Sequence, residues 1–126
     1  MTRKTETFGQ RIRSRRLDQG WSQRELAERV AARLQREDQR GFDFTYLSKI
    51  ENNKLLPSAA VISQLAIVLG DDEDELMGLA AKAPADLGET LSKSAGARAF
   101  FRSAVNKKLS EAEWRRLLKQ LEGKRK

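Results

Sequence analysis

The chain of 126 residues contains no cysteine and no histidine. Without cysteine it can form no disulfide bond and no zinc site that uses thiolate ligands. Without histidine it lacks the commonest proton shuttle of enzymes and a common metal ligand. The sequence also lacks a glycine-rich phosphate loop and a carboxylate pair in a recognisable setting. We therefore expect no enzymatic activity, no metal site and no cofactor.

Long apolar runs are lacking as well. No stretch approaches the roughly 20 apolar residues of a membrane span, and the first residues lack the apolar core of a signal peptide. We expect a cytoplasmic protein that does not bind a membrane. The length suffices for one compact domain with its own core, alone or with a small appendage.

Positive charge is abundant but unevenly distributed. The net charge is +7. Residues 1–54 hold 13 basic against 8 acidic side chains (+5), residues 55–91 hold 1 against 7 (−6), and residues 92–126 hold 11 against 3 (+8). Basic clusters suit a protein that binds phosphate groups. For the last segment, solvated helix faces are an equally good explanation, and residues 124–126 are better interpreted as a solvated tail.

A repeated helix-start signal organises the first half of the chain. It combines an apolar residue, a capping side chain, and an acidic and an apolar residue in the first helical turn. The clearest copy consists of Trp21, Ser22, Glu25 and Leu26. Before it, Thr5 or Thr7 can cap a helix that ends at Gly20. The apolar residues that this first helix should turn inward are Phe8, Ile12 and Leu17.

Three more helices are predicted between residues 42 and 80. Phe42, Asp43 and Leu47 repeat the staple around a carboxylate cap and predict a helix over residues 44–52. A helix over residues 59–69 should end at Gly70, and Asp72 should start the next one. We interpret the acidic run 71–75 as helix capping, because a calcium-type loop needs spaced oxygen ligands and a turn glycine.

This order of helices and caps resembles the Cro/cI-type (XRE-like) helix-turn-helix family of phage repressors and small bacterial regulators, over roughly residues 8 to 80. The resemblance implies an all-α fold, with a five-helix lambda-repressor-like DNA-binding domain at residues 1–83 and a short helical C-terminal extension at residues 84–126. It also implies a sequence-specific transcriptional regulator, most simply a repressor that binds a palindromic operator in double-stranded DNA as a homodimer.

The resemblance assigns roles to residues around the second helix of the motif, whose N-terminal part should lie against base edges in the major groove. Base contacts are expected from Phe44, Thr45, Tyr46 and Lys49, although Phe44 could equally belong to the core. Phosphate contacts are expected from Gln23, Asn52, Asn53 and Lys54, and weaker ones from Arg11 and Arg15. Asn53 replaces the usual glycine, and asparagine tolerates a left-handed turn.

The resemblance also implies a structural ion pair between Arg16 and Glu51. Arg16 lies on the inward side of its helix, and a buried guanidinium needs a carboxylate within bidentate reach. The alternative is that Arg16 is a solvated surface side chain.

One segment departs from the family pattern. Ala31 to Arg40 looks like an insertion of ten residues in the turn of the motif. Its composition is compatible with a helix, so the helix that begins at Ser22 could extend by two turns or more before Gly41. Arginines in this segment could contact phosphates, but an exposed extension that contacts nothing is as good an interpretation.

The C-terminal third should form helices over residues 86–91, 94–105 and 110–121. The last begins with a capping box at Ser110 and Glu113. A short helix with an apolar stripe must pack against something, and we expect a second copy of the chain, with packing inside the chain as the alternative. The residues expected at this interface are Phe100, Phe101, Trp114, Leu117, Leu118 and Leu121.

The sequence also allows a second function. The chain could be a control protein or antitoxin-like repressor whose C-terminal region is bound or cleaved by a partner, either a toxin or a regulatory metalloprotease. Residues 97–105 are the stretch that such a protease would be expected to cut.

Overall fold

The computed structural model describes residues 6–35, 42–82 and 85–124, and these residues form helices and no strand. The predicted all-α fold class is confirmed. The chain divides into two compact units, Met1–Pro84 and Ala85–Lys126.

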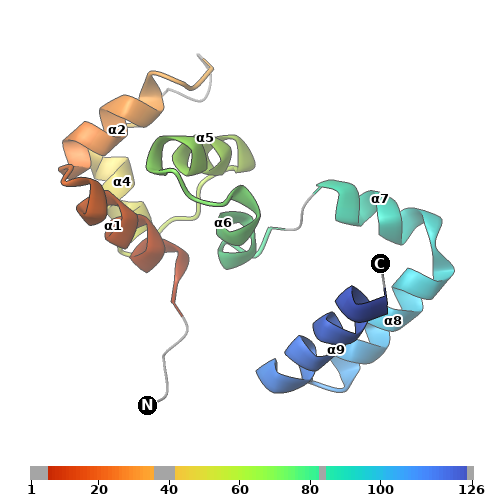
Figure 1. The fold of residues 1–126 in the computed structure, drawn as a ribbon. Helices are drawn as coiled ribbons and strands as arrows, with labels where there is room; N and C mark the ends of the chain where they lie inside the picture. The colour runs from red at the N-terminus through yellow and green to blue at the C-terminus, as the bar shows by residue number, and fades with distance from the viewer. Residues whose placement is uncertain (1–5, 36–41, 83–84, 125–126) are drawn as a thin grey trace. The chain divides into compact units, whose positions relative to one another are not determined.

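Five helices are described in the first unit (Figure 1). They are α1 (Phe8–Gln19), α2 (Gln23–Ala31), α4 (Phe44–Glu51), α5 (Ala59–Leu69) and α6 (Glu73–Leu79). Each begins at a side chain that accepts a hydrogen bond from the amide three residues later, which satisfies an N–H group that the helix itself leaves unpaired. These caps are Thr7, Ser22, Asp43, Ser58 and Asp72. Gly20 and Gly70 end α1 and α5 in the left-handed conformation, as the sequence predicts.

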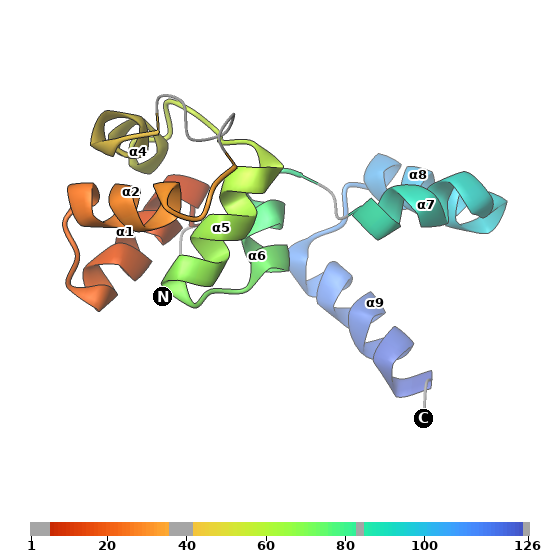
Figure 2. The ribbon, with the colours of Figure 1, turned by 90° about the horizontal axis from the view of Figure 1, so that it is seen from above.

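The core of the first unit lies between these helices. The helix α4 packs against α1 and α2, and α5 packs against α1, α2 and α6 (Figures 1 and 2). The prediction that Leu17 faces inward is wrong, because its side chain is 55% exposed. Phe8, Ile12 and Arg16 follow one another at intervals of four and form the inward face of α1, and Leu17 lies outside that face.

The helix α2 ends at Ala31, so it does not continue into the insertion as the sequence suggested it could. The amides of Arg33 and Leu34 donate to the carbonyl oxygens of Val30 and Ala31, at 3.0 and 3.1 Å, which tightens the chain into a turn. This turn brings Leu34 into the core, where it is 7% exposed. Residues 36–40 of the insertion lie outside the described residues.

The second unit contains α7 (Ala85–Lys93), α8 (Ala95–Asn106) and α9 (Glu111–Lys124). Ser94 caps α8, and Ser110 and Glu113 form the predicted capping box at the start of α9. Arg98 donates to the carbonyl oxygen of Leu91 at 2.6 Å, which connects α8 to the last turn of α7.

Candidate nucleic-acid interface

The helix α4 separates a buried face from an outward one. Leu47, Ile50 and Glu51 are at most 6% exposed and point into the first unit. The opposite face consists of residues at intervals of three and four that can all form hydrogen bonds, namely Thr45, Ser48 and Lys49, and Asn52 continues it just beyond the last residue of α4. Hydroxyl, ammonium and carboxamide groups are those that recognise base edges, so α4 presents a face with the chemistry of a DNA reader.

The other two residues predicted to contact bases lie at the edges of this face. Phe44 is 41% exposed, so it does not belong to the core, and the guanidinium of Arg24 lies 4.4 Å from its ring centroid. Tyr46 is half-buried against Phe42, with the ring centroids 5.0 Å apart. Burial raises the pKa of the Tyr46 phenol. The structure therefore places Tyr46 at the border of the core and Phe44 at the border of the outward face.

A buried ion pair connects the helices of the motif. Arg16 Nε lies 2.7 Å from Glu51 Oε2, and Arg16 Nη2 lies 3.0 Å from Glu51 Oε1. Arg16 also donates to the carbonyl oxygen of Trp21 at 2.8 Å, and Gln23 Nε2 donates to Glu51 Oε1 at 3.0 Å. The two charged side chains are 9% and 3% exposed. Arg16 and Glu51 thus form the pair expected from the sequence, and Gln23, expected at a phosphate, also belongs to it.

Asn53 connects the turn after α4 to the start of α1. Its φ of 60° is left-handed, which is the conformation expected at a position where the family usually has glycine. Its Oδ1 accepts from the amide of Gly9 at 3.0 Å, and its Nδ2 donates to Thr7 Oγ1 at 3.0 Å. Asn53 therefore holds α1 against the end of α4.

Gly9 is a residue whose role the sequence reasoning missed. A Cβ at this position would lie 2.5 Å from the carbonyl oxygen of Ile50, 2.6 Å from that of Glu51 and 2.7 Å from Asn53 Oδ1. The close approach of α1 to the end of α4 therefore requires glycine. The sequence does contain a signal for this role. Glycine has a low helix propensity, so a glycine inside a predicted helix indicates a close packing contact.

Arg11 and Arg15 bind a carboxylate of their own unit. Arg11 Nε and Nη2 lie 2.8 and 2.9 Å from the two oxygens of Asp71, and Arg15 Nε lies 3.3 Å from Asp71 Oδ2. Burial opposes the charge of Asp71, but hydrogen bonds from Arg11 and the amide of Asp72, with the charges of both arginines, lower the pKa of Asp71. Within the acidic run 71–75, Asp72 is the helix cap that the sequence predicted, whereas Asp71 is an ion-pair partner.

Three cations near the outward face of α4 remain without such partners. Arg24, Lys49 and Lys54 form no ion pair with any residue that the structure describes. The described residues include no cluster of three side chains suited to a metal ion. Across the same described ranges, no helix is long and apolar enough to cross a membrane.

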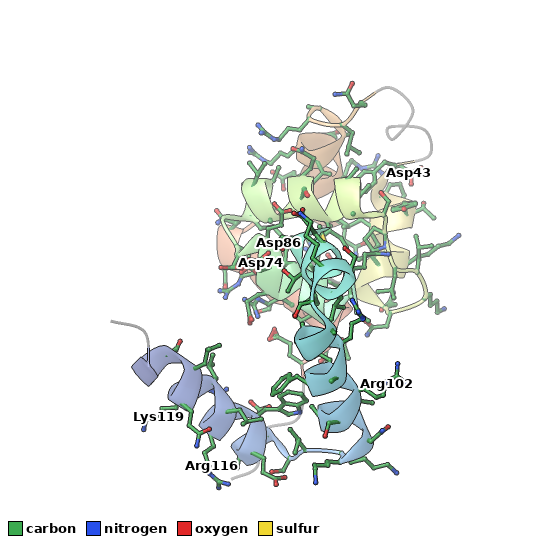
Figure 3. All side chains as sticks on the ribbon, turned by 90° about the vertical axis from the view of Figure 1, so that its right-hand side faces the viewer. Asp43, Asp74, Asp86, Arg102, Arg116 and Lys119 are labelled. Atoms are coloured by element: carbon green, nitrogen blue, oxygen red, sulfur yellow. The ribbon has the colours of Figure 1, made fainter. Side chains whose placement is uncertain are left out.

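The second unit exposes the apolar side chains that the sequence predicted at an interface. Phe100 and Phe101 are 47% and 37% exposed, Leu118 and Leu121 are 50% and 65% exposed, and Trp114 and Leu117 are half-buried. Figure 3 shows Arg116 and Lys119 on the side of α9 away from α8, and Arg102 on the side of α8 away from α9. Trp114, Leu117, Leu118 and Leu121 recur at intervals of three and four and so form one stripe of α9, and the spacing of Arg116 and Lys119 places them off that stripe.

Comparison with known proteins agrees with the geometry of the first unit. A family model described as a helix-turn-helix domain matches residues 9–82, which run from the second residue of α1 to beyond the end of α6. No curated protein and no solved structure matches the chain.

Proposed function

The chain belongs to the XRE-like helix-turn-helix domain family of DNA-binding regulators, and we propose that it is a cytoplasmic repressor that binds a palindromic operator as a homodimer. The observation that carries this proposal is the outward face of α4. Its hydrogen-bonding side chains project from a helix that the ion pair of Arg16 and Glu51 fastens to the rest of the unit. A reading helix must be held in this way, because recognition of base edges requires fixed positions.

Base edges would be contacted by two residues of this face. The Lys49 ammonium can donate to O6 or N7 of guanine, and Thr45 can offer its hydroxyl group or its methyl group. Phe44 lies beside them and supplies an apolar contact, while Tyr46 would contact a base only with the edge of its ring that remains exposed.

Phosphates would be contacted on either side of this face. Asn52 and Lys54 follow α4 and are exposed, and the first amides of α2 favour an anion. Gln23 and Asn53 each use one N–H of the carboxamide inside the protein. Each carboxamide has a second N–H, which we assign to a phosphate oxygen.

The homodimer would be formed by the second unit. Ala104 is the one apolar side chain among its described residues that is less than 9% exposed. Three short helices with so little buried apolar surface gain stability from packing against another chain. The stripe of Trp114, Leu117, Leu118 and Leu121, together with Phe100 and Phe101, supplies that contact.

A partner protein is the second candidate for the same apolar surface. The exposed rings of Phe100 and Phe101 contact each other edge to face, with centroids 5.3 Å apart, and would suit a toxin or a regulatory protease. Cleavage of residues 97–105 would require α8 to unwind, because a protease binds its substrate as an extended strand. We therefore favour the second copy of the chain.

The test starts with selection of the preferred duplex from a random library and titration of that duplex and a shuffled one. Lys49→Ala should weaken binding to the selected duplex by about 1 to 3 kcal/mol and leave the shuffled duplex nearly unaffected. Lys54→Ala should weaken binding to both duplexes alike. It should also make the slope of log K against log salt concentration shallower by about one, because one phosphate contact is lost. Lys82→Ala, beyond α6, controls for the loss of one positive charge. Equal losses on both duplexes for Lys49→Ala would show that Lys49 contacts a phosphate.

A further inference from the structure

Arg24 stacks on an aromatic ring instead of binding a carboxylate. Its guanidinium carbon lies 4.4 Å from the centroid of the Phe44 ring. The negative face of an aromatic ring attracts a cation and holds it in place. Arg24 forms no ion pair or side-chain hydrogen bond within the described part of the chain, whereas Arg11 and Arg16 bind carboxylates in bidentate fashion. Its fork of N–H donors therefore remains available to a ligand.

The stacked pair lies where the two helices of the motif begin. Arg24 is the second residue of α2, and Phe44 is the first residue of α4. Both side chains are exposed, although a phenyl ring in water gains nothing from that exposure. In this motif the second helix puts its N-terminal residues against base edges and the first helix crosses the DNA backbone, so the pair borders the surface already assigned to the operator.

We propose that Arg24 and Phe44 form a second base-reading site, which recognises a thymine and a neighbouring guanine. The proposal rests on the function proposed above and adds a reader outside α4. Phe44 would contact the 5-methyl group of thymine, and Arg24 would donate two hydrogen bonds to O6 and N7 of guanine. The guanidinium and the ring are in direct contact, with 4.4 Å between the guanidinium carbon and the ring centroid, so the two groups lie side by side. Because Phe44 seeks a methyl group and Arg24 seeks two acceptors, we assign the two groups to neighbouring bases.

The ring also prepares Arg24 for this contact. A free arginine loses rotamer freedom when it binds, whereas a guanidinium already held over a ring loses less. The bidentate fork is specific to arginine, so a lysine at the same position would keep the charge and lose the discrimination of guanine.

The chain offers a matched control on the same helix. Arg29 also lies over an aromatic ring, 4.3 Å from the centroid of Trp21. Arg29→Ala and Arg24→Ala remove the same charge and the same type of contact from α2. Arg29 lies against Trp21 and not against Phe44, so its removal should not change which bases are preferred.

The experiment repeats the duplex selection with the full-length wild type and with Arg24→Ala, Arg24→Lys, Phe44→Ala and Arg29→Ala. We expect the wild type and Arg29→Ala to enrich a thymine next to a guanine. Arg24→Ala and Arg24→Lys should lose the guanine preference, with a tenfold to hundredfold weaker binding of the wild-type duplex. Replacing the thymine by uracil, which lacks the methyl group, should weaken wild-type binding and leave Phe44→Ala unchanged.

Three outcomes would overturn the proposal. The same preference in Arg24→Lys and in the wild type would assign the pair a structural role only. Equal losses on the selected and a shuffled duplex would make Arg24 a phosphate contact. Insensitivity of the wild type to uracil would remove the contact with the methyl group. Should the wild type select no duplex, the proposed function itself fails. Thermal unfolding of each variant checks the fold, and Arg24→Lys carries the test if Arg24→Ala does not fold.

Discussion

At the scale of single residues, a few polar side chains fix the geometry of the motif. Glu51 accepts hydrogen bonds from Arg16 and Gln23, and Arg16 also binds the carbonyl oxygen of Trp21. A buried ion pair of this kind costs desolvation energy, which only good geometry and further hydrogen bonds offset. The three donors around Glu51 supply that geometry and fix the end of α4 relative to α1 and α2.

Removal of Glu51 should therefore destabilise the fold. We expect Glu51→Ala to lower the free energy of unfolding by about 3 to 5 kcal/mol, because Arg16 is left buried without its carboxylate. Arg16→Met in the Glu51→Ala background should recover part of this loss, since it removes the unpaired charge. Urea denaturation of the four proteins of this double-mutant cycle measures the effect.

An exposed pair of the same composition is the control for this cycle. Arg115 Nε lies 2.8 Å from Glu111 Oε2, but the two side chains are 76% and 74% exposed. Glu111→Ala should change stability little, because solvent screens such a pair. If Arg16→Met and Glu51→Ala were strictly additive, the buried pair would contribute no coupling energy.

Gly9 is the second residue at which substitution should be costly. Because an added Cβ would lie 2.5 to 2.7 Å from three oxygen atoms, Gly9→Ala should push α1 away from the end of α4. We expect a loss of about 1 to 3 kcal/mol in urea denaturation, the usual cost of overpacking.

The control for Gly9→Ala is Gly78→Ala in α6. A Cβ at Gly78 meets no atom within 4 Å, so alanine should stabilise the helix by about 0.5 to 1 kcal/mol. If both substitutions were stabilising, the close approach of α1 and α4 would not require glycine.

At the scale of the elements, caps and ion pairs join helices that are individually short. The described helices of the first unit contain 7 to 12 residues, too few to be stable alone in water. Asp71 joins the first of them to the turn between α5 and α6 through Arg11 and Arg15, and its side chain is 4% exposed. This contact fastens α1 to the turn after α5, whereas the ion pair of Arg16 fastens it to the end of α4.

The contact of Asp71 should make stability depend on acid pH. Because the pKa of Asp71 is lower in the folded protein than its ordinary value of 3.8, the ion pair stabilises the fold above that pH. This contribution is lost as the pH falls from 3.8 through the folded-state pKa. Asp71→Asn should lower stability at neutral pH and flatten this part of the pH profile, as measured by urea denaturation from pH 7 to pH 2.

Asp74→Asn controls for the loss of one negative charge in the same acidic run, because Asp74 is exposed and forms no ion pair with a described residue. An unchanged pH profile in Asp71→Asn would mean that other carboxylates account for the acid sensitivity.

At the scale of the whole molecule, the two units differ in how they bury apolar side chains. The first has a continuous core of buried residues from all of its described helices. In the second, most large apolar side chains are exposed or half-buried. A chain that binds a palindrome needs a contact between two copies, and the second unit has the surface for it.

Leu118→Glu or Leu121→Glu should therefore convert a dimer into a monomer without unfolding the first unit, because both leucines are at least half exposed. Light scattering should show the halved mass. Binding to a palindromic duplex should fall far more than binding to a half-site, since linked half-sites gain effective concentration from the dimer.

Lys119→Glu changes the other face of α9 and should leave the mass unchanged. Truncation after Lys108 should also give a monomer with an intact first unit. If the truncated chain stayed dimeric or unfolded, α9 would not be the dimer contact.

The local sequence determined where the helices begin and end. Ser22 and Glu25 were recognisable as a capping box because both partners lie within four residues of each other, and Gly20 and Gly70 because a left-handed helix end favours glycine. The alternation of polar and apolar residues in α4 likewise indicated its buried and outward faces. Such signals depend on neighbours along the chain and need no knowledge of tertiary contacts.

Only the tertiary structure decided which long-range partners each side chain has. The start of α1 and the end of α4 are more than 40 positions apart in sequence. No local pattern therefore showed that Gly9 must lie against Ile50 or that Asn53 binds Thr7. The same holds for Arg11 with Asp71 and for Arg24 with Phe44. The periodicity of apolar residues predicted that Leu17 faces inward. In the structure Arg16 is buried with Glu51, and Leu17 lies on the exposed side of α1. Contacts of this kind depend on how helices pack, because packing alone brings distant residues within bonding distance.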